Sequence, residues 1–291
     1  MKTSRFLTFA AVATMFAACS NENIPADETK DTPITIASAD VAELSTRVIT
    51  DDKLVGITDG ESATMSVFIT GGSETKYNAT NAKWEHNGTS WDSETDVLFE
   101  GASSQQKIYA YSPFFFDSTG SIAVDASEQT DWLVATATGL TSSAVNLTMT
   151  HALTKLVLVP TLGTELTSQT ITSVEVGGMY ASGTLNVSDN SWSDLLEANT
   201  TLAMANNELL VIPMAQCTSF PIVITMSDGR KFKATIDCPV ISPEDAEEKV
   251  YGLAPGTQYN IKLQIGQDKV TLGEITASPW GYAAGGVLET E

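Results

Sequence analysis

The chain has 291 residues, a formal net charge of −21 at pH 7 and 42% hydrophobic residues. So acidic a surface repels nucleic acids and anionic lipid headgroups, which excludes both as partners. Only 18% of the residues are charged, and Ser and Thr supply much of the remaining polarity. This composition is more typical of an extracytoplasmic β-protein than of a cytosolic helical enzyme.

Residues 1–18, MKTSRFLTFAAVATMFAA, are predicted to be a signal peptide, because two basic residues precede an apolar run without acids that is too short to span a bilayer permanently. Its removal takes away two of the fifteen basic residues and none of the 36 acids, which leaves a net charge of −23. The run ends at FAAC and a polar SNEN follows, so the site resembles a bacterial lipobox with Cys19 as the lipidated residue. An ordinary secretory signal with an incidental cysteine is the alternative.

Residues 19–47 form a leader with two parts. The first is acidic, contains Pro25 and has little apolar surface to bury. The second, TPITIASADVAEL, has enough apolar residues for one short strand. Arg47 follows and is one of three arginines in the chain, with Arg5 and Arg230.

The residues after Arg47 are predicted to form β-strands throughout. Strand-length runs of β-branched and aromatic residues end at Pro, Gly or Ser, Asn87–Gly88 predicts a type I′ hairpin between Trp84 and Trp91, and Asp228–Gly229 predicts another. A short helix or a loop turn fits SPEDAEEKVYGL. The strand spacing predicts an all-β protein, one or two antiparallel sandwiches; the length favours two, over 48–160 and 161–291, with a division near 160–163.

No arrangement of residues indicates an enzyme. His86 adjoins a hairpin turn and is predicted to be exposed, while His151 is predicted to be a hydrogen-bonded structural residue. Nucleophile-elbow, zinc-helix and phosphate-loop motifs do not occur, so neither a metal nor a cofactor is expected. Carboxylates are abundant, but none is singled out as a glycosidase pair. The five tryptophans fit a sandwich core better than a sugar-stacking platform.

Cys217 and Cys238 flank the hairpin at Asp228–Gly229. A cross-strand disulfide in an oxidising compartment fits the sequence, and so do two small buried thiols, because the residue count does not make them facing partners. Their spacing offers no metal site.

Several stretches together resemble the fimbrillin family, the lipoprotein precursors of type V pili. They are the lipobox, the acidic leader ending in STR, IYAYSP (108–113), DWLVATAT (131–138), VNLTMTHALTKLVLV (145–159), LAPGTQYNIKL (253–263) and Trp280. The match extends in order over essentially the whole chain.

The resemblance implies two transthyretin-like β-sandwich domains in tandem, without enzymatic activity. It also implies an outer-membrane lipoprotein that an arginine-specific protease cuts after Arg47, so that Val48 becomes the N-terminus of the mature chain in fimbriae. The cut would release the lipid and the leader strand, and a strand from another subunit would fill the groove that remains. The donor candidate is the segment 269–291, with Val270, Leu272 and Ile275 as groove-filling residues; a fixed C-terminal strand, as in cap or anchor subunits, is the alternative.

The leading hypothesis is therefore a stalk or tip subunit of a cell-surface pilus that mediates adhesion. The alternative is a surface lipoprotein or pilus anchor that does not polymerise and binds a glycan or a host protein through its loops. A carboxylate-dependent glycan hydrolase ranks last.

Overall fold

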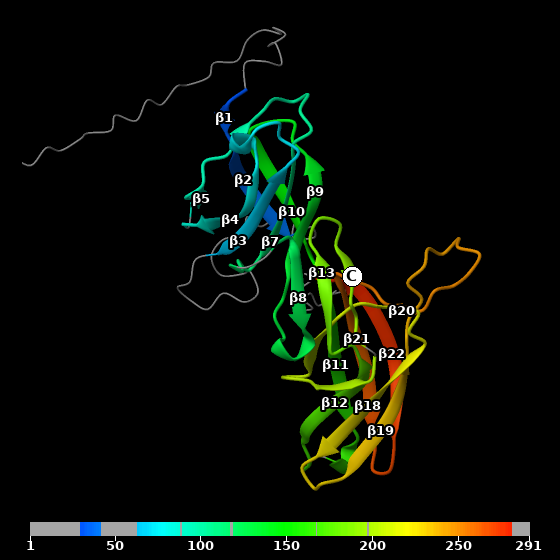
Figure 1. Cartoon of the computed structure of the whole chain (residues 1–291). Coiled ribbons are helices and arrows are strands. Elements are labelled where there is room, and N and C mark those ends of the chain that lie inside the picture. The colour runs from blue at the N-terminus through cyan, green and yellow to red at the C-terminus, as the bar shows by residue number, and fades with distance from the viewer. Residues whose placement is uncertain are drawn as a thin grey trace, which may run out of the picture.

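The computed structural model describes residues 30–41, 63–87, 89–116, 119–166, 168–196 and 198–280. They form an elongated, nearly all-β molecule, with one sheet region at the N-terminal end and a second region at the other (Figure 1). The predicted all-β class is confirmed. The transthyretin-like topology of the two regions stays a prediction.

A seven-stranded sheet forms the N-terminal region, in the order β2-β10-β9-β7-β3-β4-β5. Its strands are β2 (Thr35–Val41), β3 (Thr64–Thr70), β4 (Ala79–His86), β5 (Trp91–Ser93), β7 (Lys107–Ser112), β9 (Leu133–Gly139) and β10 (Ala144–His151). Beside it, β1 (Thr32–Pro33) pairs with β6 (Leu98–Phe99), and the 3-10 turn η1 covers Thr75–Tyr77. The alternation of buried and exposed residues in β4 and β10 places one face of the sheet on its own apolar core.

Two four-stranded sheets form most of the C-terminal region. The first has the order β16-β11-β21-β22, with β11 (Thr154–Leu162), β16 (Glu208–Val211), β21 (Thr257–Ile265) and β22 (Val270–Pro279). The second has the order β15-β12-β18-β19, with β12 (Ile171–Met179), β15 (Thr200–Ala203), β18 (Ser219–Met226) and β19 (Lys231–Asp237). Side chains of both sheets meet in one buried cluster.

The remaining elements join the regions or close loops. β8 (Ser121–Asp125) pairs with β13 (Ser182–Asn186), which also pairs with β14 (Ser191–Ser193), and β17 (Met214–Ala215) pairs with β20 (Gly252–Leu253). The 3-10 turns η2 and η3 cover Ala126–Glu128 and Thr164–Leu166. Because β8 lies between β7 and β9 in the chain, residues of the N-terminal half reach into the C-terminal core (Figure 1).

The chain passes from the N-terminal sheet to the C-terminal sheets between β10 and β11, before residue 160, where the division was predicted. β11 begins at Thr154 and pairs over its length with β21, so that Pro160 lies opposite Leu263 inside a strand. A proline fits there because β16, on the other side of β11, pairs only with Thr154–Val157. The strands of the N-terminal sheet end at His151, and the separation into two independent domains stays a prediction.

Two local predictions need correction. The hairpin between Trp84 and Trp91 forms, but its last strand pair is His86 with Trp91, so residues 87–90 and not Asn87–Gly88 alone lie between the paired strands. Asn87 N donates to the Ser90 carbonyl at 3.0 Å, and the Asn87 side chain accepts the amide hydrogens of Thr89 and Ser90. His86 is 7% exposed and meets Trp91 edge to face, so its predicted exposure was wrong.

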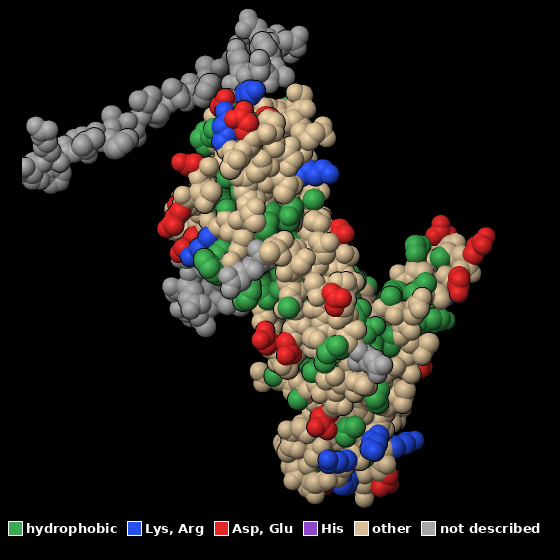
Figure 2. Space-filling view, in the orientation of Figure 1, with side chains coloured by type: hydrophobic (Ala, Val, Ile, Leu, Met, Phe, Trp, Pro, Cys, Tyr) green, Lys and Arg blue, Asp and Glu red, His purple; other side chains and the backbone are tan. Residues whose placement is uncertain are grey.

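Of the two alternatives for SPEDAEEKVYGL, the structure shows the loop: no helix forms, and only the final Gly252–Leu253 belong to a strand, β20. The bridge between Val240 and Tyr251 closes the loop at its base. Figure 2 shows its acidic side chains at the tip of an arm that projects from the C-terminal region.

Candidate functional site

The first feature of functional interest is the position of the leader strand β2 in the N-terminal sheet. β2 pairs in parallel with β10, from Thr35 opposite Ala144 to Val41 opposite Met149, and is the last strand on its side of the sheet. Over Ala144–Met149, it is the ladder partner that the structure gives to β10. One ladder of hydrogen bonds therefore holds this strand to the rest of the sheet.

Apolar side chains hold the leader strand more firmly than polar ones. Ile34, Ile36 and Ala39 are 5% or less exposed and belong to the N-terminal core, together with Leu147 and Met149 of β10. Burying two isoleucines stabilises the docked strand by about 3–6 kcal/mol. Residues 34–39 of the leader are thus an integral part of this core.

Polar contacts fix the beginning of the leader strand. Asp31 Oδ1 accepts hydrogen bonds from Lys76 Nζ at 2.8 Å and from the Tyr77 hydroxyl at 2.7 Å. These bonds, that of Lys76 first, lower the pKa of the Asp31 carboxyl below its usual value. Asp31 N also donates to the Phe99 carbonyl at 2.8 Å, and Ile34 N donates to the Val97 carbonyl at 2.8 Å. β1 is therefore bound to β6, beside the seven-stranded sheet, before β2 begins.

A groove borders β10, because β9 and β10 pair only at Leu133–His151 and Val134–Thr150 before they diverge. The groove has a volume of about 510 Å³ and is lined by both strands and the connection between them. The Ala137 amide donates to the Ser188 carbonyl at 2.8 Å, which ties this part of β9 to the C-terminal region. Thus β10 depends on β2 for most of its pairing.

The predicted processing residues Cys19, Arg47 and Val48 lie outside the described residues. The donor candidates Val270, Leu272 and Ile275 lie on β22, which is antiparallel to β21 and is an edge strand of its own sheet. All three are partly buried and pack against the C-terminal core. Within this chain they belong to a paired strand, and their donor role stays a prediction.

The end of β22 is anchored at the junction of the two regions. The Trp280 ring stacks on His151, with 3.8 Å between ring centroids and 13° between planes, and the Trp280 amide donates to the Gly256 carbonyl at 2.8 Å. His151 Nδ1 lies 2.9 Å from Asp131 Oδ1, and both side chains are buried. His151 thus has the structural role that the sequence predicted.

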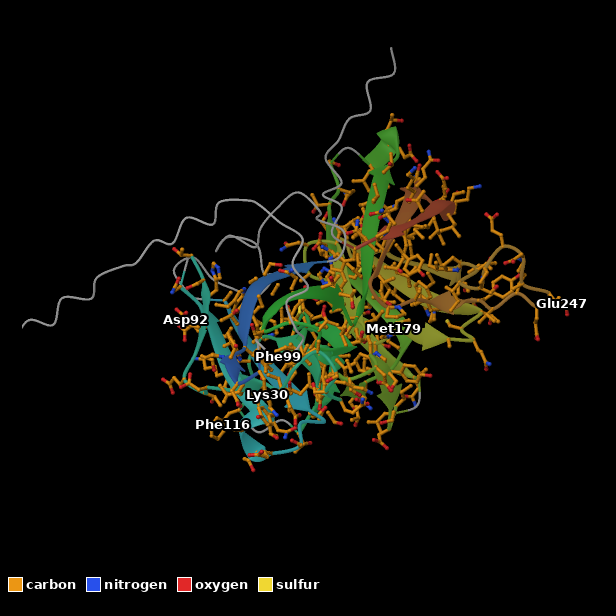
Figure 3. The ribbon with its side chains drawn as sticks, turned by 90° about the horizontal axis from the view of Figure 1, so that it is seen from above. Lys30, Asp92, Phe99, Phe116, Met179 and Glu247 are labelled. Atoms are coloured by element: carbon orange, nitrogen blue, oxygen red, sulfur yellow. The ribbon has the colours of Figure 1, made fainter. Side chains whose placement is uncertain are left out.

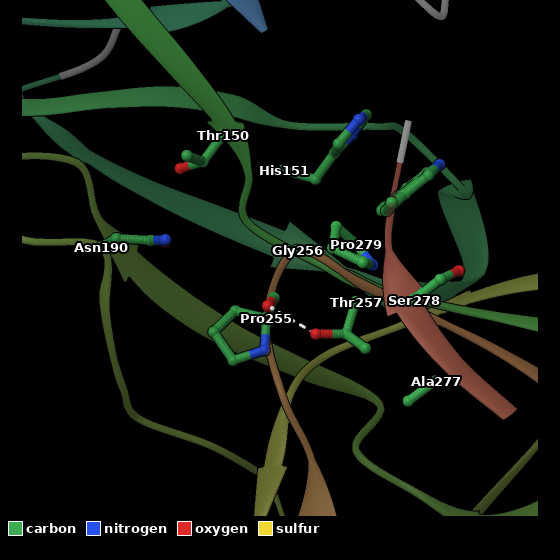
Figure 4. A pocket seen from close by; sticks show the side chains of 10 residues that line it. Thr150, His151, Asn190, Pro255, Gly256, Thr257, Ala277, Ser278 and Pro279 are labelled. Carbon is green, nitrogen blue, oxygen red and sulfur yellow. Dashed lines mark hydrogen bonds between the residues drawn. The ribbon is translucent and has the colours of Figure 1, made fainter. Parts of the chain in front are cut away.

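A pocket of about 470 Å³ opens beside this stack. Figure 4 shows Thr150 and His151 on one side of it and Pro255 and Thr257 on the other. Its walls are mainly rings and hydroxyl groups. Among the described residues there is no group of three or more His, Cys, Asp or Glu side chains that could hold a metal ion.

The sequence interpretation missed an aromatic loop. Phe115 and Phe116 are 54% and 80% exposed, yet their carbonyls accept hydrogen bonds from Asn81 Nδ2 at 2.9 and 2.6 Å, and the Tyr111 hydroxyl donates to the Phe115 carbonyl at 3.0 Å. Figure 3 shows Phe116 at the outer margin of the N-terminal region. The three consecutive phenylalanines after Pro113 were the available signal, but they fit a buried strand equally well.

Cys217 and Cys238 are brought together. Their sulfur atoms lie 2.7 Å apart at the open end of the β18–β19 hairpin. In the part of the chain that the structure describes, no helix is long and apolar enough to cross a membrane.

The described part of the chain is nearly all β, with the leader strand β2 at the edge of its sheet. The family comparison is consistent with this fold. Residues 46–280 match the model of the fimbrillin-like family, and the chain belongs to that family. Its proteins are structural subunits that assemble with other subunits in cell-surface pili.

Solved structures support the same fold. The chain is similar to putative cell adhesion proteins from Bacteroides ovatus (17% identity, TM-score 0.61, covering 86% of this chain and 98% of that one) and Bacteroides uniformis (19%, 0.58, 76% and 92%). It is also similar to the tip fimbrial protein Mfa3 from Porphyromonas gingivalis with a C-terminal truncation (10%, 0.50, 76% and 95%). No curated protein matches the sequence.

Proposed function

We propose that this chain is the lipoprotein precursor of a pilus subunit, lipidated at Cys19, cut after Arg47 by an arginine-specific protease and assembled by strand exchange. The observation that carries the proposal is β2, a leader strand that fills the N-terminal core from the edge of its sheet. Its loss would leave Ala144–Met149 of β10 unpaired and expose apolar side chains, and this combination favours binding of a strand from another subunit. Because donor and acceptor surfaces differ, such contacts propagate into a filament.

The position of Arg47 supports the cleavage step. It follows β2 and precedes β3, so one cut there separates the leader strand from the rest of the fold. Arg230, the other arginine after the signal peptide, is engaged by Asp228 Oδ2 at 2.7 Å and by the Gln267 carbonyl at 2.7 Å. The match to the family model begins at residue 46, after β2.

The experiment is to express the wild-type precursor and the Arg47→Lys variant on cells that carry the protease. We expect the wild-type chain to begin at Val48 and to form high-molecular-weight species, and the variant to remain a Cys19-lipidated monomer with its charge preserved. Arg230→Lys is the matched control and should behave like the wild-type chain. Equal assembly of Arg47→Lys and wild type would refute the proposal.

The donor strand needs its own test. A donor role for β22 requires it to leave β21, so we would cross-link the facing residues Asn260 and Thr276 as an engineered cysteine pair. If β22 is the donor, the cross-linked subunit is cleaved at Arg47 but does not polymerise, and reduction restores polymerisation. Unchanged polymerisation of the cross-linked subunit would exclude β22 as donor and favour a fixed C-terminal strand.

The second candidate function is adhesion by a surface protein that does not polymerise, including an anchor subunit. The exposed Phe115 and Phe116 favour it, since a tethered loop that presents two aromatic rings suits contact with a glycan or a host protein. If this candidate is right, the wild-type chain adheres without forming a polymer, and replacing both residues by Ser abolishes adhesion. Replacing the buried Phe68 is not a suitable control because it would disturb the core; the exposed Leu196→Ser change is.

A further inference from the structure

The structure places Cys217 and Cys238 at one end of the β18–β19 hairpin. Cys217 precedes β18 and Cys238 follows β19, while the Asp228–Gly229 turn closes the opposite end. The Cys238 amide donates to the Thr218 carbonyl at 2.8 Å, so Cys238 lies opposite Thr218 and Cys217 is its diagonal neighbour. The residue count alone did not predict that they would meet.

The side chains turn toward each other in spite of this offset. Their sulfur atoms are 2.7 Å apart, which is about 0.7 Å more than the length of a disulfide bond. Cys238 is 3% exposed within the C-terminal core, and Cys217 is partly buried against the same core. Since no third metal ligand joins them among the described residues, a metal site does not explain the pair.

We infer that Cys217 and Cys238 form an intramolecular disulfide in the exported protein. The inference rests on export to an oxidising compartment and is independent of cleavage at Arg47 and of strand exchange. Small rotations of the two side chains bring the sulfur atoms to bonding distance, because the backbone already holds the two residues next to each other.

The two thiols differ in a way that suits stepwise oxidation. The hydrogen bond that Cys238 donates lowers the pKa of Cys217 to about 7, and Cys217 is the more accessible of the two. The same hydrogen bond, together with burial, raises the pKa of Cys238. Cys217 is therefore the attacking thiolate and Cys238 the resolving thiol.

The oxidant is a disulfide of an exported oxidoreductase or of a small thiol. The Cys217 thiolate attacks one sulfur of that disulfide, forms a mixed disulfide and releases the first oxidant thiolate. Cys238 then loses its proton to solvent, and its thiolate attacks Cys217 Sγ and displaces the second oxidant thiolate. Two electrons pass to the oxidant, whose two thiolates take up the two protons released by the cysteines.

The bond would close the open end of the hairpin. β19 is an edge strand of its sheet. Soon after Cys238 the chain enters the acidic loop of SPEDAEEKVYGL, whose base is closed by the bridge between Val240 and Tyr251. Edge strands fray most readily where pairing ends. A disulfide at this position stabilises the last pairs of β19 and the base of the arm.

Peptide mapping gives the direct test. Protein isolated from the cell surface is alkylated while denatured, without reduction, and digested with trypsin, which cuts at Arg230, Lys231 and Lys233 between the cysteines. We expect peptides 156–230 and 234–249 to be recovered joined, and to separate on reduction. Recovery of both peptides fully alkylated before reduction would overturn the inference. Cys19 lies on neither peptide and does not interfere.

Thermal unfolding of the isolated protein supplies a second measurement. Reduction of the wild-type chain should lower Tm by about 5–10 °C, and hydrogen exchange should rise first in β19. Cys217→Ser should have the Tm of the reduced wild-type chain and show no response to reductant. A wild-type Tm that reduction leaves unchanged would contradict the stabilising role, even if the joined peptides were found.

Discussion

Each half of the molecule contains one long parallel strand pair, but the two pairs lie at different places in their sheets. β2 pairs with β10 at the edge of the N-terminal sheet, whereas β21 lies between β11 and β22 in the C-terminal sheet. The leader strand can leave without breaking the pairing between any other strands. β21 cannot, because its departure would break two ladders and open the core.

The order of the strands along the chain also decides which of the two parallel strands a single cut can release. β1 and β2 precede the other strands and are followed by Arg47, so a single cut can detach β2 together with β1, while β21 is joined to neighbouring strands on both sides in sequence. Apolar burial stabilises both strands. Of these two strands, only β2 lies both at a sheet edge and at a place in the chain where one cut can release it.

The largest expected effect is that of Ile261→Asp in β21. Ile261 is 1% exposed and lies opposite Leu158 in β11 and Ile275 in β22. A carboxylate there would be buried without a partner, and we expect a loss of about 5 kcal/mol or more, comparable with the whole stability of a domain. Urea unfolding followed by Trp fluorescence measures it. Gln264→Asp, at an exposed position of the same strand, should change the midpoint little.

Ile36→Asp makes the corresponding change in β2, where Ile36 is 4% exposed. We expect a smaller loss, about 2–4 kcal/mol, because the strand can undock while the remaining sheet stays folded. Hydrogen exchange should increase in residues 30–41 and along β10, with little change in the C-terminal region. Thr35→Asp, exposed on the same strand, is the control. Global unfolding of Ile36→Asp would show that β2 is as central as β21.

Local sequence patterns predicted individual strands well. The residues TMSVFIT marked Thr64–Thr70, which are the bounds of β3, although Met65–Ile69 are all buried and the predicted alternation of burial does not occur there. Asp228–Gly229 marked the turn between β18 and β19. Such patterns report which face of a strand is apolar. They predicted strands such as β10, where buried and exposed residues alternate, because period-two burial is a local property.

Partner choice was not predictable in the same way. The alternation in β8 does not reveal that it pairs with β13 across the junction, and nothing in TPITIASADVAEL specifies a parallel partner. His86 was misjudged because its nearness to a turn was given more weight than its place on the buried face of β4 with Trp84. The candidate site depends on these long-range pairings, so only its residues, not its geometry, could be predicted.

A third variant compares β22, an edge strand of the C-terminal sheet, with β2. Ile275 in β22 is partly buried and lines an apolar space with Leu156, Phe220 and Ile236. Ile275→Ala should cost about 1–2 kcal/mol, less than for a fully buried residue, because part of the side chain already contacts solvent. Thermal unfolding measures the change, with the exposed Thr271→Ala as control. No loss at Ile275 would mean that apolar burial holds β22 less firmly than it holds β2.

The smallest expected effect concerns the polar attachment of the leader, and Asp31→Asn tests it. Asp31 has a φ of 63°, a left-handed conformation that Asn tolerates, and the amide oxygen can still accept the Tyr77 hydroxyl hydrogen. Because the Lys76 and Tyr77 hydrogen bonds lower the folded-state pKa of Asp31, its contribution is complete above the unfolded pKa and is lost as the pH falls through the folded value. The Tm difference between wild type and variant should therefore stay constant from pH 7 to about pH 5, at no more than about 2 °C, and vanish in stronger acid. A larger difference at pH 7 would mean that this exposed ion pair, rather than Ile34 and Ile36, holds the leader strand in place.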